Sequence, residues 1–316
     1  MLRIIEKRKY VYVFSSILIL FAIAALSTWG LNLGIDFKGG TLMEVEFSEE
    51  DNGSEESSEI LNFVAPSRED IQEKLRDLGA NSLTIQSSEE SRIILRYVAS
   101  DENLNEQVIE KLEEFEGDVN LIRVDFIGAS VSNQLKKNAF TALTAAILGI
   151  ALYIAWSFRK ISFPIPSWQY GLGAITALAH DIIITLGIFA VLGKFLNIEI
   201  GVPFVAALLT ILGYSVNDTI VVYDRIRENL MKSDSKESFE NIINKSLNET
   251  LARSINTSLT VVIVLIAIII FGGESIKFFS VALMIGVIFG TYSSIFVASS
   301  LLVSSYNYKL NKSKNL

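Results

Sequence analysis

Long blocks of apolar residues, interrupted by short polar segments, make up most of the chain. Several of these blocks are long enough for a helix to cross a bilayer, whose hydrocarbon core of about 30 Å takes about 20 helical residues. They occupy residues 10–30, 138–157, 168–192, 201–222, 254–272 and 276–304. The first block exceeds the roughly 7 to 15 residues of a signal-peptide core, so we expect an uncleaved anchor. The pattern predicts an α-helical membrane bundle of six transmembrane helices.

The pattern becomes that of a water-soluble domain between the first and second blocks. Residues 41–47 alternate between apolar and polar as a half-buried strand does, and an amphipathic helix follows from Ser67 to Gly79. Two strands, a helix and a last strand are then predicted at residues 82–86, 92–98, 103–115 and 120–126. The order βαββαβ predicts an inserted α+β domain of the ferredoxin-like kind. The run from Ser48 to Glu59, rich in Ser, Glu and Asp, has the composition of an exposed loop.

Charge separates the same regions. Residues 32–132 contain 24 of the 35 acidic residues but 8 of the 27 basic ones. If the N-terminus is inside, the inner segments contain 15 Lys and Arg residues and the short outer segments contain 4. The positive-inside rule then predicts that both termini are cytoplasmic and that residues 32–132 are exported.

These patterns divide the chain into six parts. The cytoplasmic N-terminus with the first helix (1–31) comes first, and the exported domain (32–132) and helices two to four (133–223) follow. A cytoplasmic amphipathic loop (224–253), helices five and six (254–304) and a cytoplasmic tail (305–316) complete the chain. Apolar residues of the loop recur at helical spacing, at Phe239, Ile242, Ile243 and Leu247. This spacing predicts an amphipathic helix that either lies on the membrane as a linker or docks a partner.

Composition removes several classes of function. The chain has no Cys and a single His, His180, which excludes disulfides, thiol catalysis and Cys-based or His-rich metal centres. It has no basic patch interleaved with aromatic residues and no ATPase, nucleophile-elbow or zinc motif. We therefore expect a protein that is not an enzyme, holds no cofactor or metal and binds no nucleic acid. Any work must use another source of energy, and one charge that crosses 100 mV supplies about 2.3 kcal/mol.

Polar residues inside the apolar blocks are candidates for function, because an Asp or Arg at a membrane-helix centre costs about 2.5 to 3.5 kcal/mol. Asp218 shares a helix face with Ser215 and Thr219. In the next helix a polar stripe comprises Arg253, Asn256, Thr257 and Thr260. The two faces could form a structural ion pair, or Arg253 could snorkel to the interface. They could instead form a proton switch in which Asp218 alone titrates, because Arg stays charged.

A second candidate lies in the third helix, where Asp181 follows His180. A lone His beside an Asp could relay protons, and Asn217 is a further candidate for such a relay. The His and the Asp could equally hydrogen-bond a neighbouring helix. Since side chains at i and i+1 do not share a helix face, the two residues need not act together.

The segment GIDFKGG at residues 34–40 has glycines like those of a phosphate-binding loop. It lacks the GxxxxGK[ST] spacing, however, and does not link a strand to a helix. A tight backbone turn between the first membrane helix and the exported domain is the better interpretation. The residues of this structural motif are Gly34, Asp36, Phe37, Gly39 and Gly40.

Four motifs together resemble those of SecF, the family of membrane subunits of the bacterial SecDF protein-export complex. They are GIDFKGG (34–40), AHD (179–181), GYSVNDTIVVYDRIREN (213–229) and TLARSINTS (250–258). The first alone would also suit the related SecD, but the exported domain here is short for SecD. The resemblance covers nearly the whole chain and implies six helices with a large exported domain between the first two. The acidic run from Ser48 to Glu59 is not part of the family pattern.

The SecF family is similar to the resistance-nodulation-division transporters. The resemblance implies a protein of the bacterial cytoplasmic membrane that uses the proton-motive force to promote preprotein export. It also implies SecD as a separate subunit, the SecYEG channel, unfolded preprotein and protons as partners. Asp218 matches the family's essential membrane carboxylate and Arg253 its essential membrane arginine. The alternatives are a proton-driven small-molecule or lipid transporter half of the same transporter class and a purely structural membrane subunit.

Overall fold

The computed structural model describes residues 3–48, 66–78, 81–87, 92–98, 103–115, 117–159, 165–233 and 237–314. Contacts divide the chain into two units, one of Met1–Asn32 with Asn138–Leu316 and the other of Leu33–Lys137. Each unit has a hydrophobic core of its own. The second unit is therefore an insertion that follows the first long helix of the first unit.

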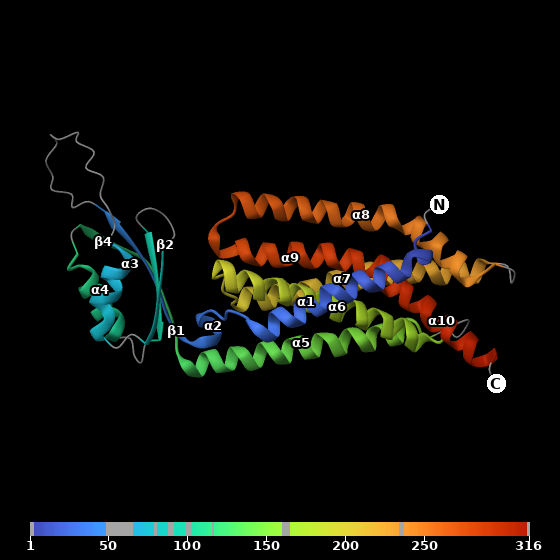
Figure 1. The fold of residues 1–316 in the computed structure, drawn as a ribbon, viewed down its shortest axis with the longest axis horizontal. Helices are drawn as coiled ribbons and strands as arrows, with labels where there is room; N and C mark the ends of the chain where they lie inside the picture. Colours follow the sequence, from blue (N-terminus) through green and yellow to red (C-terminus); the bar gives the residue numbers. More distant parts are fainter. Residues whose placement is uncertain are drawn as a thin grey trace. The chain divides into compact units, whose positions relative to one another are not determined.

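In its described residues the first unit is a bundle built on six helical segments, each long and apolar enough to cross a membrane. The segments are α1 (Arg8–Thr28, preceded by the 3-10 turn η1, Ile5–Lys7), α5 (Ala129–Ser157), α6 (Ser167–Leu196), α7 (Val202–Lys232), α8 (Phe239–Phe271) and α9 (Glu274–Tyr292), which continues through the π-helix η3 (Ser293–Ala298) into α10 (Ser299–Lys314). The long helices run alongside one another, and η1 and α10 lie at the same end of the bundle (Figure 1). The predicted helical membrane bundle is confirmed.

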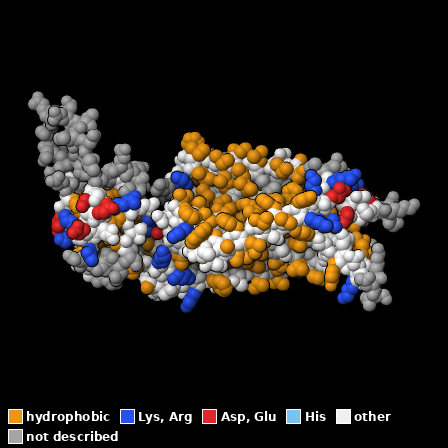
Figure 2. Space-filling model, viewed as in Figure 1, with side chains coloured by type: hydrophobic (Ala, Val, Ile, Leu, Met, Phe, Trp, Pro, Cys, Tyr) orange, Lys and Arg blue, Asp and Glu red, His pale blue; other side chains and the backbone are white. Residues whose placement is uncertain are grey.

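Apolar side chains cover the flank of the bundle, whereas Lys and Arg side chains gather toward the ends of the helices (Figure 2). Large side chains that a soluble bundle would bury are exposed here, among them Ile17 of α1, Leu152 of α5 and Ile263 of α8 at 59%, 72% and 57%. An apolar surface of this extent indicates contact with lipid or with other membrane helices.

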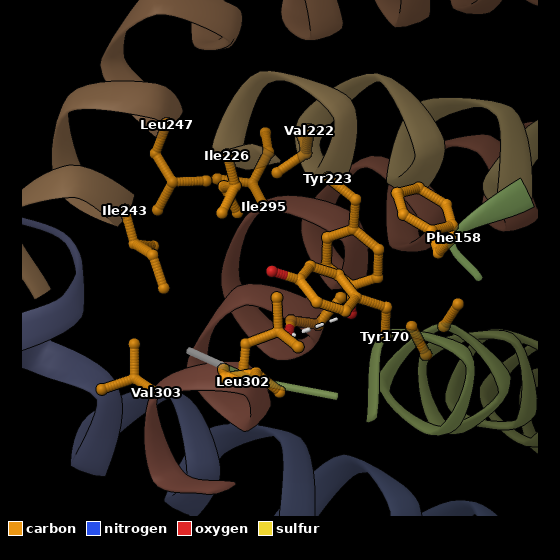
Figure 3. Packing of buried hydrophobic residues seen from close by; sticks show 14 of the residues in the cluster. Phe158, Tyr170, Val222, Tyr223, Ile226, Ile243, Leu247, Ile295, Leu302 and Val303 are labelled. Atoms are coloured by element: carbon orange, nitrogen blue, oxygen red, sulfur yellow. Dashed lines mark hydrogen bonds between the residues drawn. The ribbon is translucent and has the colours of Figure 1, made fainter. Parts of the chain in front are cut away.

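An aromatic cluster fills the interior of the bundle beside η3. The rings of Tyr170 in α6 and Tyr223 in α7 meet edge to face at 5.3 Å, and Phe158 stacks on Tyr170 at 5.5 Å (Figure 3). Such ring pairs contribute about 0.5 to 1.5 kcal/mol each beyond the area that they bury. The Tyr223 hydroxyl also donates to the carbonyl oxygen of Ala298 at 3.3 Å. The cluster thereby ties α6 and α7 to η3.

The helix α8 departs from the prediction. It runs without a break from Phe239 to Phe271, so the predicted loop helix and the fifth membrane helix are one element. Its apolar residues Phe239, Ile243 and Leu247 lie in the core of the bundle. Figure 3 shows Ile243 and Leu247 in the same cluster as Ile226 of α7. The chain itself covers this apolar face, which is therefore not available to lie on a membrane surface or to bind a partner.

The second unit contains a four-stranded antiparallel sheet and two main helices. Its elements are β1 (Gly40–Ser48), α3 (Arg68–Leu75) with the turn η2 (Arg76–Leu78), β2 (Asn81–Ser87), β3 (Arg92–Val98), α4 (Asn103–Leu112) and β4 (Asp118–Ile127). The strands lie in the order β2-β3-β1-β4, and every neighbouring pair is antiparallel. Alternate residues Met43, Val45 and Phe47 of β1 are buried in one cluster with apolar residues of α3 and α4.

The predicted elements of this unit are all present at the expected places. The helix α3 begins after Ser67, whose side chain accepts a hydrogen bond from the Asp70 amide at 3.2 Å. Such a cap satisfies one of the unpaired N–H groups of the first helical turn. The predicted helix end at Gly79 and the acidic loop beyond Ser48 lie outside the described residues.

The GIDFKGG segment forms the turn that leads into the sheet. A short helix, α2 (Ile35–Lys38), buries Phe37, and Gly39 and Gly40 follow with φ of 78° and 119°. A Cβ at Gly40 would lie 2.5 Å from the carbonyl oxygen of Tyr97, so only glycine fits there. The segment leads from a helix into a strand, which is the reverse of the order in a phosphate-binding loop.

Candidate functional site

Buried polar side chains gather in the interior of the bundle, on α6, α7, α8, α9 and η3. Two carboxyl groups lie among them, Asp181 at 0% exposure and Asp218 at 9%. A carboxyl at this depth in a membrane helix is costly unless hydroxyl or cationic partners surround it. Its partners therefore define the site.

Asp181 of α6 lies at the first centre, where three helices meet. One carboxylate oxygen, Oδ2, accepts hydrogen bonds from the hydroxyls of Ser215 in α7 at 2.6 Å and Ser293 in η3 at 2.8 Å. The other, Oδ1, lies 2.9 Å from Nδ1 of His180. Both oxygens are thus satisfied, as buried carboxyls require.

His180 and Asp181 are in direct contact, although consecutive side chains do not share a helix face. The His180 side chain, at 2% exposure, bends back along α6 far enough for Nδ1 to meet its neighbour. Its Nε2 has no hydrogen-bond partner among the residues that the structure describes. The ring of Tyr292 stacks over the imidazole at 6.0 Å, and the Tyr292 hydroxyl pairs with Ser15 of α1 at 3.1 Å. Nδ1 of the imidazole is therefore held by Asp181, whereas Nε2 has no hydrogen-bond partner in the described part of the chain.

The π-helix η3 explains how the last membrane segment reaches Asp181. Gly290 precedes it and lets α9 approach α7, since a Cβ there would lie 3.1 Å from Cβ of Ser215. The wider turn then places two consecutive hydroxyls toward the interior, Ser293 on Asp181 and Ser294 on Thr219 at 2.8 Å. Isolated π-turns are frequent at functional sites. Sequence reasoning missed both serines, and the doublet at 293–294 was the available signal.

Asp218 of α7 forms the second centre. Its Oδ1 accepts a hydrogen bond from the hydroxyl of Ser254 in α8 at 2.6 Å. Its Oδ2 is buried and has no partner within the described part of the chain. Farther along α8, the Ser258 hydroxyl accepts from the Tyr214 hydroxyl at 3.2 Å and pairs closely with Thr291 of α9. Asp218 thus contacts one hydroxyl of α8, and the next hydroxyl of the same face of α8 connects α7 to α9.

The predicted pairing of Asp218 with Arg253 is not observed. The face of α8 that meets α7 carries Ser254 and Ser258, both buried, while the predicted stripe of Arg253, Asn256, Thr257 and Thr260 is exposed. No ion pair joins Arg253 to Asp218 among the described residues, although the guanidinium charge still acts on the carboxyl through space. Asn217 is also exposed, away from both centres.

Both centres are joined through α7. Ser215 reaches Asp181, and Asp218 lies three residues later on the same helix. Between them, Thr219 donates to the Ser215 carbonyl oxygen at 3.1 Å and pairs with Ser294. Within the described residues no hydrogen bond of this group reaches Asp218, so the link between the two carboxyls is the backbone of α7. The described residues contain no group of three His, Asp or Glu side chains that could hold a metal ion.

Comparisons with known proteins converge on one family. Residues 107–308 match the model described as protein export membrane protein SecD/SecF, C-terminal, and residues 24–51 match the SecD/SecF GG motif. Proteins named protein translocase subunit SecF are similar, with 38% identity in Sebaldella termitidis (98% of this chain, 93% of that protein) and 41% in Thermobaculum terrenum (97% and 95%).

A solved structure is similar over nearly the same length. It is the crystal structure of SecDF, a translocon-associated membrane protein, from Thermus thermophilus, with 30% identity and a TM-score of 0.78. The match covers 96% of this chain, and this chain spans 38% of the SecDF chain. The fold of the present chain therefore corresponds to one part of the longer SecDF polypeptide.

Proposed function

This chain belongs to the SecD/SecF family of protein export membrane proteins, and from that premise we propose that it is a proton-driven subunit of the Sec protein translocase. In this role it promotes export of unfolded preproteins together with SecD and the SecYEG channel. Family and helix content together make it a multi-pass protein of the bacterial cell membrane. One observation carries the proton-driven role: Asp218 is a buried carboxyl with an oxygen that has no partner in the described chain.

Asp218 is the group that takes up and releases the proton in this proposal. Its single hydrogen bond, from Ser254, joins α7 to α8. A proton on Oδ2 adds a hydrogen-bond donor to the carboxyl. It also removes the negative charge that attracts the Arg253 guanidinium. Both changes alter the interaction between these two helices. The titrating group is the carboxyl, since an arginine stays charged.

The energy available is adequate for such a movement. A proton that crosses 100 mV delivers about 2.3 kcal/mol, which exceeds the roughly 0.6 kcal/mol of an average hydrogen bond between membrane helices. No covalent chemistry is needed, so the proposed protein is a transducer rather than an enzyme. Movement of α7 and α8 would be passed to the inserted domain, which we propose acts on the exported polypeptide.

The inserted domain is proposed to be ferredoxin-like and to lie outside the cytoplasm, with both termini inside. The element order βαββαβ and the strand order β2-β3-β1-β4, with antiparallel neighbours throughout, support the split-βαβ topology. The excess of Lys and Arg in the short segments on the side of the termini supports the orientation.

SecD is the proposed partner in the membrane. Polar residues on an exposed membrane-helix face are unfavourable against lipid, and α8 carries Arg253, Asn256, Thr257 and Thr260 on such a face. Asn217 lies on the exposed side of α7. A homologous set of helices with polar groups of its own would cover these residues. The SecDF chain, of which this chain spans 38%, has room for such a second part.

A photo-reactive benzoylphenylalanine at position 257 of α8 is expected to cross-link to SecD in membranes. The same group at position 152 of α5, where Leu152 is 72% exposed on the apolar flank, is the matched control and should give no SecD product. Mass spectrometry of the cross-linked species checks both. If SecD products formed from position 152 alone, SecD would lie against α5 rather than α8, which would contradict the proposed interface.

Export into inverted membrane vesicles tests the function as a whole. Vesicles that contain the chain should export a preprotein faster when a proton gradient is present, and an ionophore should remove that gain. Vesicles without the chain should show no such gain. The rival function, efflux of a small molecule or lipid by one half of a related transporter, predicts proton-coupled movement of that compound and no effect on preprotein export.

A further inference from the structure

A groove of about 600 Å³ opens on the side of the bundle, at the end where η1 lies. Its walls come from three separate parts of the first unit: η1 with the start of α1, the middle of α8, and the junction of α9 with η3. Its volume is large enough for part of a lipid molecule.

The lining is sorted along the groove by chemistry. Arg3 and Lys7 contribute the basic groups, whereas Val11 and Phe14 of α1 contribute apolar surface. Lys7, Val11 and Phe14 recur every three or four positions, so they share one helix face, and Arg3 lies four residues before Lys7, ahead of η1. At a rise of about 1.5 Å per residue, Lys7 and Phe14 are separated by about 10 Å along the helix. The groove is therefore basic at the bundle end and apolar toward the middle of the membrane segment.

We propose that this groove binds an anionic phospholipid. The phosphate lies between Arg3 and Lys7, and one acyl chain follows Phe14 toward Leu251 and Phe296, which also line the groove. A soluble anion would meet only the basic end and leave the apolar length uncovered. Another protein helix would cover the apolar length and would need an acidic side chain opposite Arg3 and Lys7 to match the basic end. A phospholipid with an anionic headgroup matches both parts.

The basic pair is available to such a ligand. Arg3 pairs with Glu6 at 3.4 Å, but the two side chains are 78% and 56% exposed, and exposed pairs of this kind are weak. Lys7 is exposed and forms no ion pair with any residue that the structure describes. Basic residues close to a membrane surface attract anionic lipids, and two of them at one groove mouth make the attraction local.

Occupation of the groove bears on the candidate site, because Tyr292 belongs to both. Its ring lines the groove, meets Phe14 edge to face at 5.6 Å and stacks over His180 at 6.0 Å on its other side. An acyl chain against Phe14 would press on the ring that covers the imidazole. The lipid site is inferred from the shape and the charges of the groove, so it does not depend on the proposed export function.

Native mass spectrometry of the full chain in detergent, titrated with dioleoyl phosphatidylglycerol or dioleoyl phosphatidylcholine, tests the proposal. The wild type should retain more phosphatidylglycerol than phosphatidylcholine. The double variant Arg3→Gln with Lys7→Gln should reduce that preference by roughly tenfold or more, given the contribution of each basic residue near a lipid surface. The double variant Lys309→Gln with Lys312→Gln removes two exposed charges from α10 and should keep the wild-type preference.

A second variant, Val11→Trp, fills the groove and leaves its charges in place. It should reduce retention of both lipids, and inorganic phosphate should displace neither from the wild type. An unchanged phosphatidylglycerol preference in the Arg3 and Lys7 variant would overturn the proposal. Displacement by inorganic phosphate would show an anion site without an acyl chain. Loss of SecD copurification in Val11→Trp, with lipid retention intact, would show that a subunit fills the groove.

Discussion

Replacing Asp218 by Asn is expected to abolish the part of preprotein export that depends on the proton gradient. The amide has nearly the same shape and can still accept the hydrogen bond that Ser254 donates at 2.6 Å, but it cannot take up a proton. Its NH2 group would occupy the place of Oδ2, which has no partner in the described chain. Oδ2 already lacks a partner in the wild type, so the amide adds no new unpaired group and the variant should melt close to the wild type.

The measurement is export into inverted vesicles with and without an ionophore, at matched amounts of assembled protein. Asp224→Asn is the control, because Asp224 lies on the same helix, is 65% exposed at its side chain and pairs with Arg227 at 3.4 Å. This variant should keep the gradient-dependent fraction of the wild type. Full gradient-dependent export by Asp218→Asn would leave the carboxyl a structural role and rule out the proposed proton site.

Most of the fold could be predicted because long apolar runs, which indicate membrane helices, differ clearly from the two-residue alternation that indicates strands. Apolar runs of membrane length gave six helices, and alternation between residues 41 and 47 gave the first strand. The surroundings of the long helix α8 could not be predicted in the same way. The spacing of Phe239, Ile243 and Leu247 specifies an apolar face but not what covers that face. A membrane surface, a partner and the chain's own core impose the same helical period, so the sequence could not separate them.

The candidate site could be located but not assembled from the sequence. The high cost of a carboxyl in a membrane singled out Asp218 and Asp181. Their partners depend on helix rotation: Arg253 and Ser254 are adjacent in sequence and about 100° apart around α8. Both faces of that helix are polar, so no hydrophobic contrast sets which one meets α7. The π-turn at η3 is also invisible to a 3.6-residue period, which hides the contact of Ser293 with Asp181.

Replacing Asp181 by Leu is expected to destabilise the bundle more than any other single change among these polar residues. The carboxyl is fully buried, and removing it leaves the Ser215 hydroxyl and the His180 imidazole without their partner. Ser293 keeps the Gly290 carbonyl oxygen as an acceptor at 3.1 Å. Each unpaired group costs about 1 to 3 kcal/mol, and the sum is a large part of the 5 to 15 kcal/mol typical of a folded domain. Thermal unfolding of the purified chain should show an early or missing transition.

Asp181→Asn separates the structural role of this residue from a role in proton transfer. The amide oxygen can accept from Ser215 and Ser293 as Oδ2 does, and its NH2 group can donate to Nδ1 of His180 when the imidazole proton is on Nε2. Every hydrogen bond of the centre is then kept. Since both oxygens of Asp181 already have partners, unlike Oδ2 of Asp218, we expect near wild-type melting and gradient-dependent export. Wild-type melting with loss of gradient-dependent export would instead assign His180 and Asp181 to the proton path, and Asp218 would then be one station of a longer relay.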